Sequence, residues 1–246
     1  MNLRDLIDQY RSRTGDTEKP YLWSDQDITG FYNEAQVEAC VRARLIFDAD
    51  SRFLSIPLRA NTGEYEINPS ILQNGIVDVY VDGYAGTTCP GFMLRGTDQS
   101  ALDRERWFHY RSQTGRPIYF MQDGHTLRLA PIPNNTGTLR MAVYRVPACE
   151  EKLEDDDDEP VISNQLHLRL VDWALYLGYS VNDAEKVNPE KAALAEARFD
   201  ASFGKRVDAN TDRKRSERRS SVSKVNWPAS YPLNAARPYR RHSRII

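Results

Sequence analysis

The sequence has few cysteines, and they do not form a recognisable site. Cys40, Cys89 and Cys149 are odd in number, far apart and without a CxxC pair. The pattern therefore predicts neither a disulfide framework nor a zinc site. We expect all three thiols to be reduced and to have no chemical role.

Long apolar runs are also missing. The chain begins MNLRDLIDQYRSR, which carries charges throughout and does not resemble a signal peptide. No apolar stretch approaches the ~20 residues that a membrane-spanning helix needs. The sequence therefore predicts a protein that is made and assembled inside a cell and has no membrane partner.

Motifs that carry catalysis are absent as well. The sequence contains no glycine-rich phosphate loop, GxSxG elbow or HExxH pair. His109, His125 and His167 fall in separate predicted elements, and His242 falls near the C-terminus. Isolated histidines of this kind are usually structural. We predict no enzyme, no catalytic or metal-binding residues and no cofactor.

The composition is that of a folded protein with an uneven charge distribution. The chain has 246 residues, 40% of them hydrophobic and 28% charged, enough for one large domain or two small ones. Residues 205–246 hold twelve Lys and Arg against three acidic residues, a charge of +9. The total of −2 leaves −11 for residues 1–204. An acidic body with a basic tail favours contact with another molecule or with further copies.

Residues 163–204 are predicted to form two packed helices. Apolar residues in the first helix recur at steps of three and four, and those of the second share one side. Asn188 is a side-chain cap and Pro189 suits the first turn, while Gly204 suits the residue just past the end. The short connection predicts an antiparallel hairpin with a structural role. The inward residues are Leu166, Leu170, Trp173, Ala174, Leu177, Val181, Ala192, Ala195, Phe199 and Phe203.

Two more helices are predicted at the N-terminus. Asn2 caps the first, and Gly15 lies just beyond its end. Ser24 and Asp27 form a capping box for the second, which is expected to run to about Phe47. We expect the following residues to face inward: Leu3, Leu6, Ile7 and Tyr10 in the first helix, and Ile28, Phe31, Ala35, Ala39 and Ile46 in the second.

Three charged residues of the second helix repeat every four positions. Glu34, Glu38 and Arg42 are therefore predicted to pair along its exposed side. Trp23 and Ile28 occupy the positions of a hydrophobic staple at its start.

Residues 52–146 read as short strands broken by Gly, Pro and Asn. Alternation such as Val77, Val79 and Val81 against polar neighbours indicates an antiparallel sheet with one buried face. Asp123-Gly124 is a hairpin signal, and DQSALDRERW predicts a short helix or loop between strands. The expected strands are FLSIPL, EYEI, GIVDVYVDG, GFMLRG, RPIYFMQDG, HTLRLAP and GTLRMAVYRV.

An acidic segment connects these strands to the helical hairpin. Residues 150–159 include four consecutive aspartates, residues 155–158, and Pro160 follows. Such a run is typical of a solvated linker, a contact for a basic partner or, less often, a cation site without calcium-loop spacing.

These elements predict an α+β fold in which a helical bundle carries an inserted antiparallel β-domain and an extended tail. The expected divisions are N-terminal helices at 1–50, the β insert at 51–148, the acidic linker at 149–162, the hairpin packing on the N-terminal helices at 163–204, and the basic tail at 205–246.

Two passages resemble a known family. WSDQDITGFYNEAQVEACVR (residues 23–42) is similar to the N-terminal helix of head-to-tail adaptors, or connectors, of tailed bacteriophages. HLRLVDWALYLGYSVNDAEKVNPEKAALAEARFDASFG (residues 167–204) is similar to their C-terminal hairpin. The resemblance implies a virion protein, assembled in the host cytoplasm, that forms a ring, usually a dodecamer, beneath the portal. Such a ring surrounds the DNA exit channel and meets a downstream tail or nozzle protein.

The basic tail matches no fixed motif of that family, and we predict that it binds the portal or a neighbouring subunit. Its composition cannot bury enough apolar surface to fold alone, but it contains cationic residues and spaced apolar anchors. The alternative is a nucleic-acid-binding protein, because the tail clusters arginines and interleaves aromatic residues. The predicted binding residues are Arg213, Lys214, Arg215, Arg218, Arg219, Trp227, Tyr231, Arg237, Tyr239, Arg240, Arg241 and Ile245.

Overall fold

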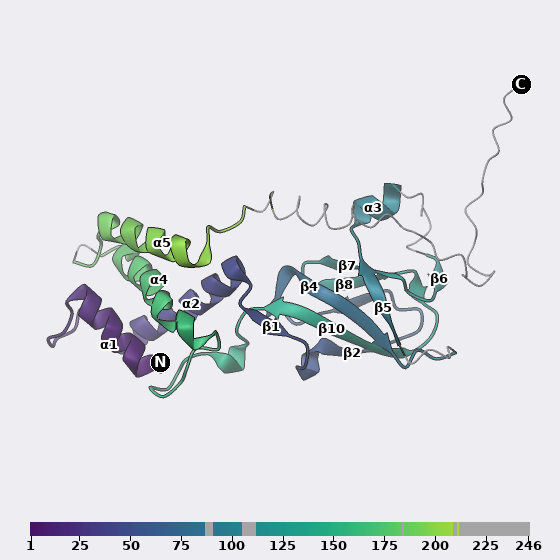
Figure 1. The fold of residues 1–246 in the computed structure, drawn as a ribbon, viewed down its shortest axis with the longest axis horizontal. Coiled ribbons are helices and arrows are strands. Elements are labelled where there is room, and N and C mark those ends of the chain that lie inside the picture. Colours follow the sequence, from purple (N-terminus) through teal and green to yellow (C-terminus); the bar gives the residue numbers. More distant parts are fainter. Residues whose placement is uncertain (87–90, 105–111, 184, 209–210, 212–246) are drawn as a thin grey trace, which may run out of the picture.

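The computed structural model describes residues 1–86, 91–104, 112–183, 185–208 and 211. It confirms the mixed α+β class, with the long helices gathered at one end and a curled sheet at the other (Figure 1). The helices are α1 (Leu3–Thr14), α2 (Asp25–Ala43), α3 (Gln99–Arg104), α4 (His167–Ser180) and α5 (Pro189–Phe203), with short 3-10 turns at Arg52–Leu54, Cys149–Glu151 and Asn164–Leu166.

Eight strands form the main sheet, in the order β1-β10-β4-β5-β7-β8-β3, with β2 also paired to β10. The strands are β1 (Ile46–Asp48), β2 (Ser55–Leu58), β3 (Glu64–Glu66), β4 (Ile71–Asp82), β5 (Gly91–Gly96), β6 (Thr114–Gly115), β7 (Tyr119–Asp123), β8 (Thr126–Ala130), β9 (Ile132–Pro133) and β10 (Gly137–Arg145), with β6 and β9 forming a separate pair.

The prediction of a wholly antiparallel β-domain is wrong at two places, and one of them is the short β6–β9 pair, which is parallel. Strand β5 runs parallel to β7, with Arg95 opposite Tyr119. Parallel neighbours need a long crossover, and the segment between these strands contains α3, the helix expected there. The hairpin predicted at Asp123-Gly124 is confirmed, since β7 and β8 pair antiparallel up to Asp123 opposite Thr126.

Local signals in the sequence placed the helix starts correctly. Asn2 and Ser24 both form complete capping boxes, and the Asn188 side chain accepts a hydrogen bond from the Lys191 N–H. Gly15 adopts the left-handed conformation after α1. Gly204 also has a positive φ of 82°, but its ψ of 166° lies outside the left-handed helical region. The chain therefore leaves α5 in an extended direction.

Helix α2 ends earlier than predicted. Arg44 adopts the left-handed conformation with φ 52°, and its N–H closes the helix by donating to the Cys40 carbonyl. Ile46 and Phe47 then begin β1, where Ile46 lies opposite Arg145 of β10. Pairing with a strand distant in sequence outweighs the helical periodicity, which continues through Ile46.

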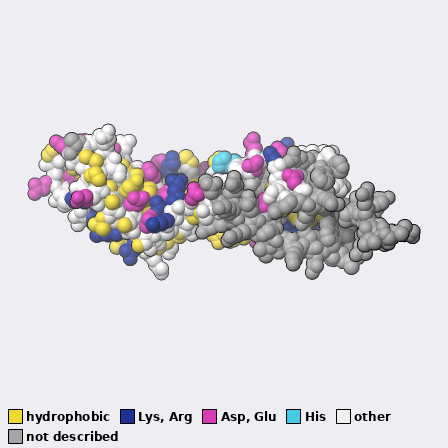
Figure 2. All heavy atoms as spheres, turned by 90° about the horizontal axis from the view of Figure 1, so that it is seen from above, with side chains coloured by type: hydrophobic (Ala, Val, Ile, Leu, Met, Phe, Trp, Pro, Cys, Tyr) yellow, Lys and Arg dark blue, Asp and Glu magenta, His cyan; other side chains and the backbone are white. Residues whose placement is uncertain are grey.

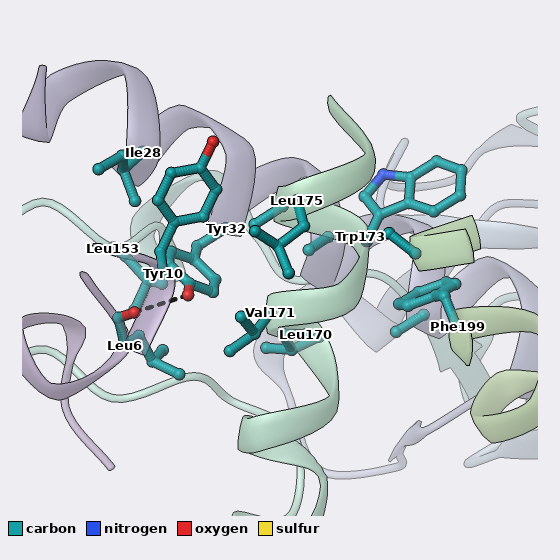
Figure 3. Packing of buried hydrophobic residues seen from close by; sticks show 14 of the residues in the cluster. Leu6, Tyr10, Ile28, Tyr32, Leu153, Leu170, Val171, Trp173, Leu175 and Phe199 are labelled. Carbon is teal, nitrogen blue, oxygen red and sulfur yellow. Dashed lines mark hydrogen bonds between the residues drawn. The ribbon is translucent and has the colours of Figure 1, made fainter. Parts of the chain in front are cut away.

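The helices enclose one apolar core, in which α4 contacts α1, α2 and α5. Leu6, Ile28, Leu170 and Phe199 are almost completely buried (Figure 3). The Tyr32 hydroxyl donates to the Leu6 carbonyl at 2.7 Å, so this buried phenol has a hydrogen-bond partner. Aromatic rings extend the core onto α5, where Trp173 and Phe199 lie 4.9 Å apart between ring centroids.

A second core lies on the inner face of the sheet. It is built from alternate residues of its strands, including Val79, Val81, Leu139 and Val143. The predicted inward position of Val77 is wrong, since its side chain is 36% exposed. The register shifts between Ala142 and Val143 show that β4 contains one extra residue here. Such a bulge reverses which residues face inward, so Ile76 is buried in place of Val77.

Candidate assembly interface

The residues predicted to bind the portal or a neighbouring subunit, from Arg213 to Ile245, all lie outside the described residues. The structure does describe the point from which this tail departs, as far as Asp208. In Figure 1 the C-terminal ends of α2 and α5 both lie on the side of the helices that faces the sheet. The tail therefore begins between the two cores.

A polar network around the buried Arg42 side chain holds this starting point, which we call the tail root (Glu38, Arg42, Asp200, Gly204 and Arg206). Within it, the Arg42 guanidinium donates from Nε to Glu38 at 2.7 Å, and from Nη1 to Asp200 at 2.5 Å and to the Gly204 carbonyl at 3.2 Å. One guanidinium thus joins the end of α2 to the last turn of α5.

The tail root was only partly predicted. Glu38 and Arg42 do pair, but the Arg42 side chain is only 4% exposed and does not lie on a solvated helix face. Its guanidinium lies 4.7 Å from the Trp173 ring centroid and 5.0 Å from that of Phe199. Helix α5 covers this face, which sequence spacing within α2 could not indicate.

The first arginine of the tail also reaches this network. Arg206 lies 3.7 Å from Glu38, with 69% of its own side chain exposed. An exposed ion pair of this length contributes little stability. The Arg206–Glu38 pair instead holds the start of the tail beside α2, just after Gly204 leaves α5.

The acidic linker does more than bridge two parts of the chain. The Asp158 and Asp156 carbonyls accept hydrogen bonds from the N–H groups of Leu3 and Arg4, at 2.8 and 3.1 Å. These donors belong to the first turn of α1, where helical N–H groups have no partner within the helix and negative charge is favourable. The linker thus caps α1.

The linker side chains divide into two groups. Leu153 is buried in the helical core, and Asp158 turns back to accept hydrogen bonds from the N–H groups of Glu154 and Asp155, which lower the pKa of the Asp158 carboxyl. Asp155 and Asp157 remain exposed, as a solvated linker requires. Within the described residues, no group of three or more His, Cys, Asp or Glu side chains could hold a metal ion.

A second ionic cluster ties the linker to the sheet. Arg145 donates from Nε to Asp48 at 2.6 Å and forms a bidentate pair with Glu151 at 2.6 and 2.8 Å. Burial opposes ionisation of Asp48, but hydrogen bonds from Ser51 and Arg145 outweigh it and lower its pKa to about 2. The Arg145 hydrogen bond likewise lowers the pKa of Glu151. No local pattern indicates this cluster, because its members are up to 103 positions apart (151 − 48).

The histidines and cysteines that the structure describes do not converge. His167 is completely buried, and its Nε2 donates to the Ile162 carbonyl at 2.8 Å, whereas His125 is exposed at a hairpin. Burial raises the pKa of the Cys40 thiol to about 12, and Cys149 is exposed. His109, His242 and Cys89 lie outside the described residues.

Charge on the visible surface is mixed. On the face seen in Figure 2, acidic and basic side chains alternate over the helical end instead of forming a patch of one sign. Among the helices of the described ranges, none is both long and apolar enough to cross a membrane.

Comparison with known proteins identifies the family. Residues 1–224 match the SU10 adaptor protein family. No curated protein matches the chain. The family match covers α1 to α5, the sheet and the first part of the basic tail, and it includes both passages that resembled phage adaptors. The chain therefore belongs to the SU10 adaptor protein family, as its resemblance to phage head-to-tail adaptors predicted.

Proposed function

We propose that this protein forms a ring beneath the phage portal, joins the capsid vertex to the tail and surrounds the DNA exit channel. The observation that carries this proposal is the family match over residues 1–224. By the same resemblance, the ring is a dodecamer at the portal vertex, and it contacts a downstream tail or nozzle protein. Genomic DNA passes through it without sequence-specific binding, and the protein acts as a structural component and not as an enzyme.

In this proposal the helical bundle, the β-domain and the tail have separate tasks. Contacts of α4 with α1, α2 and α5 support a single helical body made of residues 1–50 and 163–204. The separate apolar core of the sheet supports the insert at residues 51–148 as a second body. The acidic linker at 149–162 fastens both, through α1 and through Arg145. The tail, residues 205–246, is left to make contacts outside the subunit.

The tail docks the ring onto the portal. Its cationic residues, such as Arg213 and Arg218, pair with carboxylates of the partner, and its last aromatic and apolar residues, Tyr239 and Ile245, act as anchors. Ordering such a segment costs conformational entropy that only many contacts can offset. The fixed tail root supports this role, because it gives every copy in a ring the same point and direction of departure.

A truncation that preserves the tail root tests this proposal. The variant ends at Asp208, so it keeps Arg206 and the Arg42 network, and the full-length chain is the control. We expect the truncated protein to remain folded by circular dichroism but not to bind portal-containing heads, which then lose DNA or fail to receive tails. Unchanged occupancy on portals would refute the docking role.

The same variant separates this function from nucleic-acid binding. We expect the full-length chain to bind a short DNA duplex weakly at physiological salt. A nucleic-acid-binding function would instead give tight binding with a steep salt dependence that the truncation abolishes. Unchanged portal occupancy together with that result would reassign the tail to nucleic acid.

A further inference from the structure

The outer face of the sheet carries exposed apolar side chains on four neighbouring strands. We call these five residues the apolar stripe: Phe47 of β1, Tyr144 of β10, Val77 and Tyr80 of β4, and Met93 of β5. Met93 is 62% exposed and Phe47 is 56% exposed, and the other side chains are partly exposed. Outer faces of antiparallel sheets are usually polar, and an exposed contiguous apolar patch marks an interaction site.

Strand register places these residues on one face. Phe47 lies opposite Tyr144, and Tyr80 lies opposite both Met93 and Arg140. Residues directly opposite one another in neighbouring strands share a face, and so do alternate residues of one strand. Arg140 and Tyr144 are four positions apart on β10, so the two pairs belong to the same surface. The bulge in β4 adds Val77 between them.

The dimensions of the stripe suit an extended peptide. Four residues along β10 span about 13 Å, and the three strand spacings from β1 to β5 span about 14 Å, which gives a diagonal of about 20 Å. About six residues of extended chain cover that length. The stripe is thus too narrow for a large flat interface and long enough for a strand-like segment.

We infer that the apolar stripe of one copy receives the C-terminal segment of a neighbouring copy, through Trp227 and Tyr231. The inference rests on the ring of the proposed function. The apolar faces of the long helices are buried within the subunit, as the complete burial of Ile28, Leu170 and Phe199 shows. A contact between copies must therefore use other surfaces, and the stripe is an apolar surface that the described fold leaves exposed.

The length and the sequence of the tail fit this position. Trp227 lies 23 residues beyond Gly204 (227 − 204), a reach of about 75 Å when extended. Trp227 and Tyr231 are four residues apart, about 13 Å in an extended chain, which matches the separation of Arg140 and Tyr144 along β10. Pro228 is part of this segment, and proline favours extended backbone.

The chemistry of the two surfaces is complementary. Tyr80 and Tyr144 offer aromatic rings that can stack with other rings or with guanidinium groups. The same kind of contact occurs within the subunit, where the Arg116 guanidinium lies 3.8 Å from the Phe92 ring centroid. Asp78 shares the outer face of β4 with Tyr80 and supplies a carboxylate. The tail brings a net charge of +9 together with its aromatic residues.

Photo-crosslinking tests the inference on the full-length chain. Met93 is replaced by p-benzoylphenylalanine, and Leu194, an exposed residue of α5, is replaced in a control chain. After assembly on portal-containing heads, we expect the probe at Met93 to crosslink to peptides that contain Trp227 or Tyr231. The control should not. We expect the yield to fall at least fivefold when both aromatic residues are changed to serine.

Mixed assemblies show which copy supplies the segment. A probe-carrying chain that ends at Asp208 is mixed with unlabelled full-length chain, so any crosslink to the tail must come from a neighbour. Loss of that crosslink would refute the exchange between copies. Crosslinks from Met93 to the portal, to another stripe, or to no tail peptide would also overturn the inference. If the truncation still abolished portal binding, the proposed function would stand although this inference had failed.

Discussion

Gly178 allows α4 to approach α1 closely. Adding one methyl group at Gly178 should lower the stability of the protein, whereas adding one at Gly30 of α2 should raise it. A Cβ at Gly178 would overlap Tyr10 Oη, and the next atom, Tyr10 Cζ, would lie only 3.1 Å away. A Cβ at Gly30, an exposed position in α2, meets nothing within 4 Å. The two glycines therefore form a matched pair of helical positions.

Gly30→Ala should stabilise the protein. Alanine is favoured over glycine in a helix by about 1 kcal/mol, and 1 kcal/mol shifts the melting temperature by about 2–4 °C in a domain of this size. Gly178→Ala gains the same helix propensity, but the new methyl group must displace the Tyr10 ring, which is completely buried beside Trp23. Overpacking costs about 1–3 kcal/mol. Because this ring has no space to move, we expect a net loss of about 2 kcal/mol.

A second substitution isolates the cause. Tyr10 Oη has no hydrogen-bond partner among the described residues, so Tyr10→Phe removes the overlap without breaking a hydrogen bond. In the double variant with Gly178→Ala, we expect most of the lost stability to return, a coupling of about 2 kcal/mol. Urea unfolding followed by tryptophan fluorescence measures the wild type and all four variants. If Gly178→Ala proved as stable as Gly30→Ala, or Tyr10→Phe gave no rescue, the close approach would not be the cause.

Four further predictions concern charge and assembly. Arg42→Met should lower the free energy of unfolding by about 3 kcal/mol, because it leaves the carboxylates around Arg42 unpaired. The control Arg140→Met removes an exposed pair with Asp82 and should cost less than about 1 kcal/mol. Equal losses in the two variants would contradict a stabilising role of the Arg42 network. The lowered pKa of Asp48, about 2, means that its contribution is present above about pH 4 and is lost as the pH falls toward 2. Asp48→Asn should therefore flatten the acid limb of a stability-against-pH curve, and an unchanged limb would refute that contribution. Purified protein should be monomeric or weakly associated by sedimentation, because the apolar faces of its long helices are buried within the subunit, and a salt-resistant ring without portal would contradict this expectation. Lysine or arginine substitutions at lumen-facing positions should slow DNA ejection from assembled particles if the acidic body, at −11, lines the channel; faster or unchanged ejection would argue that it does not.

The sequence predicted those features whose causes lie within a few residues of one another. Asn2, Ser24 and Asn188 were identified as caps because each donor and acceptor lie within three positions. Most residues predicted to face inward from the helices are buried, since helical spacing determines which residues share a face, but Tyr32 is completely buried and the predicted Phe31 is only half-buried.

Features that depend on distant partners could not be predicted in the same way. Nothing near Arg42 in sequence indicated that it would pair with Asp200. The helical periodicity continues through Ile46, so the sequence did not indicate that Ile46 pairs with Arg145 in a strand. The bulge at Val77 arises from pairing with β10, so alternation within β4 could not place it, although Asn74 with φ 53° and the following Gly75 mark an irregular strand. The residues predicted to form the assembly interface lie outside the described residues, so their role stays a prediction.

The negative charge of the body is not all available to a partner. Glu38 and Asp200 are paired with Arg42, and Asp48 and Glu151 are paired with Arg145, so two guanidinium groups offset half of the charge of these four carboxylates within the fold. The carbonyls and Asp158 of the linker are likewise used internally.

The exposed part of the acidic run, including Asp155 and Asp157, stays open to a basic partner. These carboxylates lie at the first turn of α1, at the end of the molecule where the helices gather (Figure 1). The tail root lies instead where α2 and α5 meet the side of the sheet. A tail that pairs with the acidic run must therefore extend across a subunit or reach another copy, and its length allows either path. The separation of the two charged segments favours contacts between copies, because a tail intended only for its own body would need no arm of about forty residues.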